Sequence, residues 1–137
     1  MNWQRGNNGV RLLLDTHAFL WWLVGDPALS PAASRAIADE DNSVFVSAAS
    51  AREITAKYRL GKLPGVTAIV ADLDAAISDQ GFAGLAVSVR HGQAAGALPG
   101  PHRDPFDRLL IAQAMVEQLV LISNERPFDV YGVARLW

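Results

Sequence analysis

The sequence contains no cysteine, and this absence excludes several kinds of chemistry. A chain without thiols has no disulfide scaffold, no cysteine nucleophile, no thiolate zinc site and no cysteine-bound iron–sulfur cluster. Positive charge is also scarce, because 12 Lys and Arg residues stand against 14 Asp and Glu, for a net charge of −2. The broadly basic surface typical of nucleic-acid-binding domains is therefore missing. Any contact with phosphate must come from a local basic patch or a metal ion.

Long apolar runs are absent as well. Runs such as residues 19–24 are far shorter than the roughly 20 residues that cross a membrane. The polar residues 1–9 do not resemble a secretory signal, and we expect them to form a disordered leader. Residues 10–137 are expected to fold as one domain, because 50% of the chain is hydrophobic and 19% is charged. We expect a cytoplasmic protein that does not associate with membranes.

Short apolar runs alternate with helical patterns along the chain. Strands are expected at 10–14, 43–46, 85–89, 120–122 and within 133–137. Helices are expected at 16–23, 31–39, 48–60, 66–80, 91–98 and 104–118. This alternation predicts an α/β fold, a three-layer sandwich in which helices cover both faces of a central parallel sheet of about four to five strands. In such sheets, ligands bind at the carboxyl ends of the strands.

Acidic residues stand near the carboxyl ends of the expected strands. Asp15 directly follows the first strand, Glu53 lies within two turns of the end of the second, and Asp107 opens the helix before the fourth. Glu125 follows the fourth strand, where a solvated loop acid would also be ordinary. Carboxylates that converge at one edge of the sheet cannot all stay ionised without a cation, and oxygen-only ligands favour Mg²⁺ or Mn²⁺ over zinc. Such an ion suits phosphodiester hydrolysis by an activated water.

These residues also have structural interpretations. Asp15 fits a helix N-cap, and Glu53 fits a surface ion pair with Lys57, four residues later. Asp104 fits the N-cap of the helix at 104–118, with Asp107 in its first turn. We assign capping to Asp104 and favour metal binding for Asp107.

The histidines do not have the spacing of a metal site. His17 is expected near the first acidic residue, whereas His91 and His102 are interpreted as structural or surface residues. The tryptophans at 21–22 are interpreted as core or interface residues.

Several stretches carry a resemblance to a known family. They are LLLDTH and FLWWL at 12–17 and 19–23, SAAS leading to REI at 47–54, HRDPFDRLLIAQA at 102–114, and the closing segment at 128–137. In this order and spacing they resemble the PIN-domain proteins, and in particular the VapC-type ribonuclease toxins of bacterial type II toxin–antitoxin modules. The stretch at 102–114 is the most specific, and the resemblance covers residues 10–137.

The resemblance implies a PIN-like sandwich and an endoribonuclease that depends on Mg²⁺ or Mn²⁺. It places Asp15, Glu53 and Asp107 at the first three metal-binding positions. Asp104 either joins them through water or only caps its helix. The fourth position, usually aspartate, is Glu125, which keeps the charge but adds a methylene and puts a second metal site in doubt.

Supporting residues, partners and RNA contacts are also implied. Thr16 and Ser123 are the supporting hydroxyls. The resemblance implies a homodimer that a VapB-type antitoxin holds inactive, in a heterotetramer or larger assembly, with RNA as the substrate. The basic residues form either solvated helix faces or contacts with RNA phosphates, and Arg108 could instead pair with a neighbouring acid. The candidate phosphate contacts are Arg52, Lys57, Arg59, Lys62, Arg103, Arg108 and Arg126.

Two other classes that place an acid after the first strand fit the sequence less well. Haloacid-dehalogenase-type phosphatases need a second acid two residues after the first, where this chain has His17. Receiver domains need clustered acids beside the first strand and a lysine near the chain end, and this chain has neither. The alternative is a catalytically weak PIN-like module that acts by binding RNA or protein. The departure at Glu125 favours this alternative, whereas the presence of Asp15, Glu53 and Asp107 disfavours it. A catalytic module should bind Mn²⁺ and lose it in Asp15→Asn.

Overall fold

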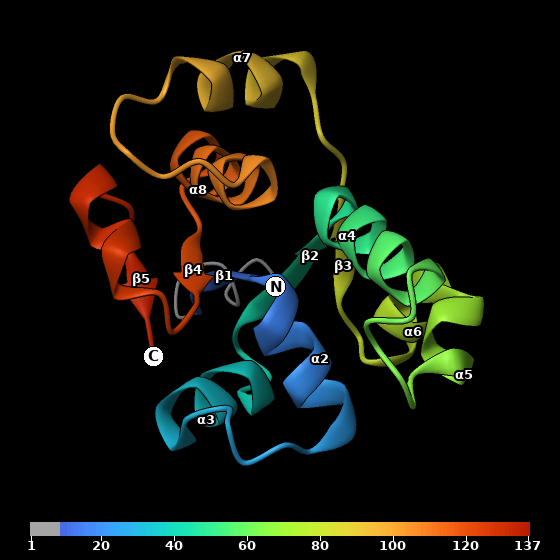
Figure 1. Ribbon diagram of the computed structural model, residues 1–137. Coiled ribbons are helices and arrows are strands. Elements are labelled where there is room, and N and C mark those ends of the chain that lie inside the picture. The colour runs from blue at the N-terminus through green and yellow to red at the C-terminus, as the bar shows by residue number, and fades with distance from the viewer. Residues whose placement is uncertain (1–8) are drawn as a thin grey trace.

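A five-stranded parallel sheet forms the centre of the computed structural model, which describes residues 9–137 (Figure 1). The leader expected at 1–9 lies, apart from Gly9, outside the described residues. The strand order is β3-β2-β1-β4-β5, and each neighbouring pair is parallel. The predicted α/β sandwich is confirmed. The strands are β1 Arg11–Leu14, β2 Ser43–Ser47, β3 Ala83–Leu85, β4 Val120–Ile122 and β5 Arg135–Leu136.

Helices lie on both sides of this sheet, with α2 and α3 on one side and α7 and α8 on the other (Figure 1). The helices are α2 Thr16–Val24, α3 Pro31–Ala38, α4 Ala48–Arg59, α5 Thr67–Ala71, α6 Leu73–Asp79, α7 Val89–Ala97 and α8 Pro105–Glu117, followed by the 3₁₀ helix η1 Arg126–Tyr131. None of the helices within residues 9–137 is long and apolar enough to span a bilayer.

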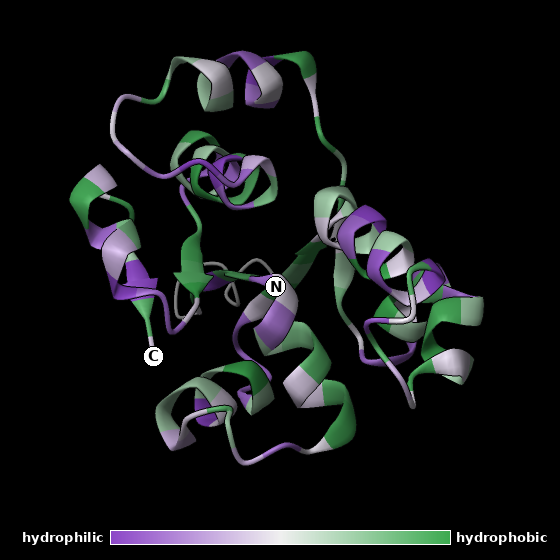
Figure 2. Ribbon diagram, viewed as in Figure 1, coloured by the Kyte–Doolittle hydropathy of each residue, from purple (hydrophilic) through white to green (hydrophobic). Residues whose placement is uncertain are grey.

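The central strand β1 supplies both faces of the core. Leu12 and Leu14 belong to the hydrophobic cluster beneath α2 and α3, whereas Leu13 belongs to the cluster beneath α8. This split follows from the strand geometry, because successive side chains point to opposite faces. All three leucines are buried, and Figure 2 shows hydrophobic residues along β1 and β4. A run that is apolar at every position therefore marks a strand covered on both faces.

Side-chain caps start several helices directly after strands. Asp15 accepts a hydrogen bond from the Ala18 backbone N–H at 2.8 Å and begins α2 immediately after β1. Ser47 does the same for α4 after β2, accepting from the Ala49 N–H at 3.0 Å. These caps, which the sequence predicts, fix α2 and α4 at the carboxyl edge of the sheet.

Two expected elements differ from the structure. The helix expected at 66–80 is divided into α5 and α6, because the Asp72 backbone is not helical (φ −153°, ψ 88°) and its side chain caps α6 through the Ala75 N–H at 3.0 Å. The strand expected at 85–89 lies earlier, at β3. The side chains and backbones of Ser88 and His91 form a reciprocal capping box, which begins α7 at Val89. The 3₁₀ helix η1 was not expected from the sequence.

Candidate active site

Carboxylates line most of a small pocket at the carboxyl ends of β1 and β2. The pocket has a volume of about 90 Å³. It brings together all five acidic residues that the sequence singles out, with two neighbours of Asp15 and one lysine. The lining residues are Asp15, Thr16, His17, Glu53, Lys57, Asp104, Asp107 and Glu125.

Asp15 is the most buried of these acids, with 5% of its surface exposed. Its backbone N–H donates to the Ile122 carbonyl at 3.0 Å, which ties it to the end of β4. Burial raises the pKa of Asp15 above its usual value, and the charge of Asp107 also raises it. Hydrogen bonds from the Ala18 N–H and the Ser123 side chain lower this pKa in part, as does the charge of His17. Asp15 is therefore a carboxylate whose charge the protein alone does not fully stabilise.

Glu53 is held by two partners in the pocket and is also buried. Thr16 Oγ1 donates to Glu53 Oε1 at 2.6 Å and lies 3.0 Å from Ser50 Oγ. Lys57 Nζ lies 3.0 Å from Glu53 Oε2, which is the ion pair expected from the spacing of the two residues. Glu53 therefore forms the ion pair and also lines the pocket, so its structural and functional interpretations are compatible.

Asp107 is paired with a histidine. His102 Nε2 lies 2.7 Å from Asp107 Oδ2, and the His102 ring meets Phe128 edge-on at 5.3 Å between centroids. Burial raises the pKa of Asp107, and the charges of Asp104 and Glu53 add to this rise, whereas the hydrogen bond from His102 opposes it. The sequence interpretation of His102 as a structural or surface residue missed this contact, although it lies in the same short motif.

Asp104 and Glu125 complete the acidic lining. Asp104 Oδ1 accepts from the Phe106 and Asp107 N–H groups at 2.9 and 3.1 Å, so the cap assigned from the sequence is present. Glu125 begins the turn into η1, and its backbone N–H donates to Ser123 Oγ at 3.0 Å. Ser123 therefore links the last acidic residue to Asp15.

The donor set fits a hard divalent cation in its chemistry. The pocket offers five carboxylates and a hydroxyl, and oxygen ligands of this kind suit Mg²⁺ or Mn²⁺. Burial, with a smaller part from neighbouring acids, raises the pKa of both Asp15 and Asp107, and a bound cation would stabilise their charged forms. Within residues 9–137, no three acidic or histidine side chains are already placed as ligands of one ion. Lys57 instead pairs with Glu53, and the His102 ring hydrogen-bonds to Asp107.

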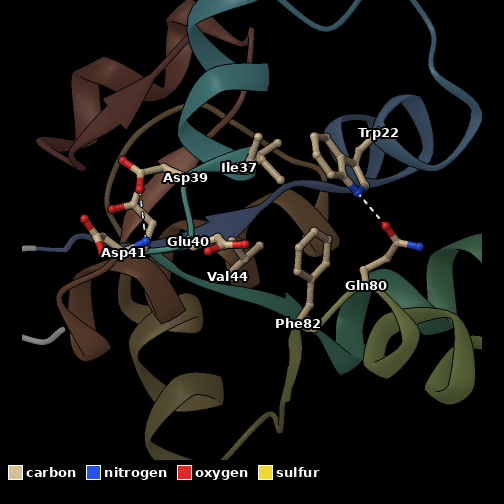
Figure 3. A pocket seen from close by; sticks show the side chains of 11 residues that line it. Trp22, Ile37, Asp39, Glu40, Asp41, Val44, Gln80 and Phe82 are labelled. Atoms are coloured by element: carbon tan, nitrogen blue, oxygen red, sulfur yellow. Dashed lines mark hydrogen bonds between the residues drawn. The ribbon is translucent and has the colours of Figure 1, made fainter. Parts of the chain in front are cut away.

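A larger cavity of about 820 Å³ lies at the opposite edge of the sheet, before β2 and β3 (Figure 3). Trp22, Val44 and Phe82 line it on one side, and an acidic turn lines it on the other. In that turn Asp39 Oδ1 accepts from the Asp41 N–H at 2.9 Å. None of the acids in the small pocket lines this cavity, so cavity size alone would have selected a different site.

Arg108 is engaged by backbone carbonyls rather than by a neighbouring acid, and this engagement disfavours a phosphate contact. Its guanidinium donates to the carbonyl oxygens of His102 at 2.9 Å, of Ala95 at 3.2 Å and of Leu98. These bonds hold the segment between α7 and α8 and engage both terminal nitrogens. The other candidates, Lys57 apart, are exposed: Arg52, Arg59, Lys62, Arg103 and Arg126.

Replacing Arg108 is expected to destabilise the fold. Arg108→Ala leaves carbonyl groups of the α7–α8 segment without donors, and we expect a loss of about 1–3 kcal/mol in the free energy of unfolding. Arg103→Ala, on an exposed neighbour, should change it by less than about 0.5 kcal/mol. Urea denaturation measures both. An Arg108→Ala protein with wild-type stability and weakened RNA binding would instead restore the phosphate contact.

Comparison with known proteins gives a consistent result. A model of the PIN domain matches residues 12–133. VapBC2 from Rickettsia felis, bound to a DNA fragment from its promoter, is similar with a TM-score of 0.69 and 17% identity, covering 93% of this chain and 98% of that one. VapBC-1 from nontypeable Haemophilus influenzae is similar with a TM-score of 0.67 and 15% identity, covering 93% of this chain and 97% of that one. Mycobacterium tuberculosis VapC20, a sarcin–ricin-loop-cleaving toxin, is similar with a TM-score of 0.61 and 16% identity, covering 90% of this chain and 96% of that one. No curated protein sequence matches this chain.

Proposed function

This chain belongs to the PIN-domain family, and from that premise we propose that it is a metal-dependent endoribonuclease, the toxin of a type II toxin–antitoxin pair. One observation carries the proposal, namely that five carboxylates line one pocket at the carboxyl edge of the sheet. The similarity to VapC20, which is named for cleaving the sarcin–ricin loop, supports RNA as the substrate. The similarity to VapBC2 and VapBC-1 supports a VapB-type antitoxin as the partner.

Asp15, Glu53 and Asp107 are the residues that would hold Mg²⁺ or Mn²⁺, and Glu125 would stand at the fourth acidic position. When bound, the ion supplies positive charge that polarises a phosphoryl oxygen and makes a water easier to deprotonate. Asp104 Oδ1 caps α8, and we propose that any part Asp104 takes in ion binding runs through water.

Neighbouring side chains fix the positions of these three carboxylates. Thr16 fixes one oxygen of Glu53, and His102 fixes one oxygen of Asp107. Ser123 and the start of α2 fix Asp15. Among residues 9–137, Lys57 is the only lysine or arginine that forms an ion pair with a pocket carboxylate. If Glu53 turns to a metal ion, Lys57 becomes available to an RNA phosphate.

We further propose that the toxin is a homodimer and that the antitoxin joins it in a heterotetramer or larger assembly. The exposed Arg52, Arg59, Lys62, Arg103 and Arg126 are the proposed phosphate contacts. A chain of net negative charge needs such local contacts, because its overall field repels RNA.

Glu125 is expected to matter less than the three acids at the first metal positions. Glu125→Gln keeps the side-chain size and removes the charge, and we expect a rate loss of about 10-fold, the lower end for outlying groups at metal sites. Initial rates of RNA cleavage at several Mn²⁺ concentrations measure this effect. A loss as large as that of Asp107→Asn would place Glu125 among the primary ligands.

The proposed function is tested by cleavage of total bacterial RNA with purified, antitoxin-free protein. Cleavage should occur with Mg²⁺ or Mn²⁺ and stop with EDTA. Asp15→Asn protein purified in the same way controls for contaminating nucleases and should be inactive. Cleavage that persists in EDTA, or equally in the variant, would contradict the proposal. A folded protein that neither cleaves RNA nor binds Mn²⁺ would favour the catalytically weak binding module.

A further inference from the structure

An exposed imidazole on the rim of the carboxylate pocket has no part in the proposed reaction. His17 lines the pocket, and its ring stacks on Trp21 with 5.5 Å between centroids and 29° between planes. We propose that His17 and Trp21 form a nucleobase subsite, on which an unpaired RNA base beside the scissile phosphate stacks. This inference rests on the proposed function, because it names a contact that the RNA substrate makes.

The pair is held in place before any ligand binds. Trp21 is half-buried and packs against the hydrophobic cluster beneath α2. Its ring also meets Trp137 at the chain end, with 5.8 Å between centroids and 57° between planes. A ring fixed in this way loses little conformational freedom when a ligand stacks on it, so more of the stacking energy appears as affinity.

His17 stands beside the acidic pocket, where a base next to the scissile phosphate would lie. His17 follows buried Asp15 by two residues at the start of α2, so it is exposed at the rim while Asp15 is buried within the site. A base is joined to its phosphate by a single sugar, so a base-binding ring must stand next to the phosphate-binding pocket. Aromatic and histidine rings stack on any base, but only on one that is not paired in a duplex.

A related pair stands next to two pocket acids in the sequence. The Arg52 guanidinium lies 5.6 Å from the centroid of the Phe106 ring, and Arg52 is exposed. Both residues are sequence neighbours of pocket acids, Glu53 and Asp107.

Trp22 provides a matched control within the same helix. It faces the larger cavity at the opposite edge, where its Nε1 donates to Gln80 Oε1 at 2.9 Å (Figure 3). Trp22→Phe therefore removes an indole from α2 without changing the pocket rim.

The test measures binding of a short, mixed-sequence, single-stranded oligoribonucleotide that carries 2-aminopurine, whose fluorescence falls when it stacks. All variants carry Asp107→Asn to prevent cleavage. His17→Ala should weaken binding about 5- to 100-fold and reduce the 2-aminopurine quenching, as expected for loss of one base–aromatic stack. His17→Phe keeps a planar ring and should bind within about threefold of the parent, as should Trp22→Phe. Circular dichroism verifies that each variant is folded.

Specific outcomes would overturn the subsite. Unchanged binding by His17→Ala would do so, and so would equal weakening by His17→Phe, because the ring nitrogens of His17 rather than its planar face would then be responsible. If His17→Ala binds RNA normally but escapes inhibition by the antitoxin, the ring belongs to the protein partner instead. Cleavage of total RNA by the wild type separates these results from failure of the proposed function, which would abolish cleavage altogether.

Discussion

Asp107→Asn is expected to abolish RNA cleavage while leaving the fold intact. Asparagine has the same shape and can still accept a hydrogen bond from His102, so α8 and its neighbours should not move. The lost charge is one of those that the cation needs, and metal-ion catalysis is worth several kcal/mol. Since each 1.36 kcal/mol is tenfold in rate, we expect a loss of at least about 100-fold. Initial cleavage rates and thermal unfolding measure the two parts of this prediction.

A matched control for this variant is Asp79→Asn. Asp79 is an exposed acid at the end of α6 and does not line the pocket. The same loss of one negative charge there should leave the cleavage rate unchanged. A fully active Asp107→Asn enzyme would remove the basis for the metal site.

Asp15→Asn is expected to abolish cleavage and, without metal, to make the protein more stable. Burial raises the pKa of Asp15, which means that its charge is unfavourable in the folded state. Asparagine is as good an N-cap as aspartate, so the bond to the Ala18 N–H is retained. We expect a gain of about 0.5–2 kcal/mol in the free energy of unfolding at neutral pH, typical of substitutions that relieve a strained functional site. Calorimetry in EDTA measures it.

The pH dependence of this gain has a definite sign. Because the pKa of Asp15 is higher in the folded than in the unfolded state, the folded protein binds this proton more tightly. The stabilisation from the protonated carboxyl is full below the unfolded pKa and is lost as pH rises through the folded pKa. The stability advantage of Asp15→Asn over the wild type should therefore grow from acidic to neutral pH.

Metal should reverse the order of the two proteins. A cation that binds only the folded state stabilises it by mass action, so Mn²⁺ should raise the melting temperature of the wild type and not that of Asp15→Asn. If Asp15→Asn is instead less stable than the wild type in EDTA at neutral pH, the Asp15 carboxylate stabilises the fold. The prediction that this charge is kept for metal binding at a cost in stability would then be wrong.

The fold was largely readable from the sequence because its signals are local. Continuous leucines at 12–14 mark a buried strand, and Ser47 and Asp104 mark helix starts with their side chains. The errors occurred where a local pattern had two solutions. Helical spacing continues through Asp72, but its side chain caps a new helix there. Strand β3 has the sequence Ala-Gly-Leu and is largely exposed, so it lacks the apolar run by which a buried strand is predicted.

The acids of the site and the Lys57 partner of Glu53 were readable for related reasons, whereas the His102 partner of Asp107 was not. The topology of a parallel sheet brings strand ends together, so Asp15 and Glu53 could be placed without side-chain detail. The contact between His102 and Asp107 depends on the path of the segment before α8. Arg108 sets that path through carbonyl groups, which carry no sequence signal. Motif residues therefore identified the pocket, but rotamers decided which of them are paired.

Crystals grown with Mn²⁺ would give the most direct test, because anomalous scattering locates the ion itself. We expect a peak in the carboxylate pocket within bonding distance of Asp15, Glu53 and Asp107, with Lys57 no longer paired to Glu53. The same pocket should show no peak in Asp15→Asn crystals. A pocket without Mn²⁺ at saturating concentration, with Lys57 and His102 still on their carboxylates, would contradict the assignment of these acids as the metal site of a ribonuclease.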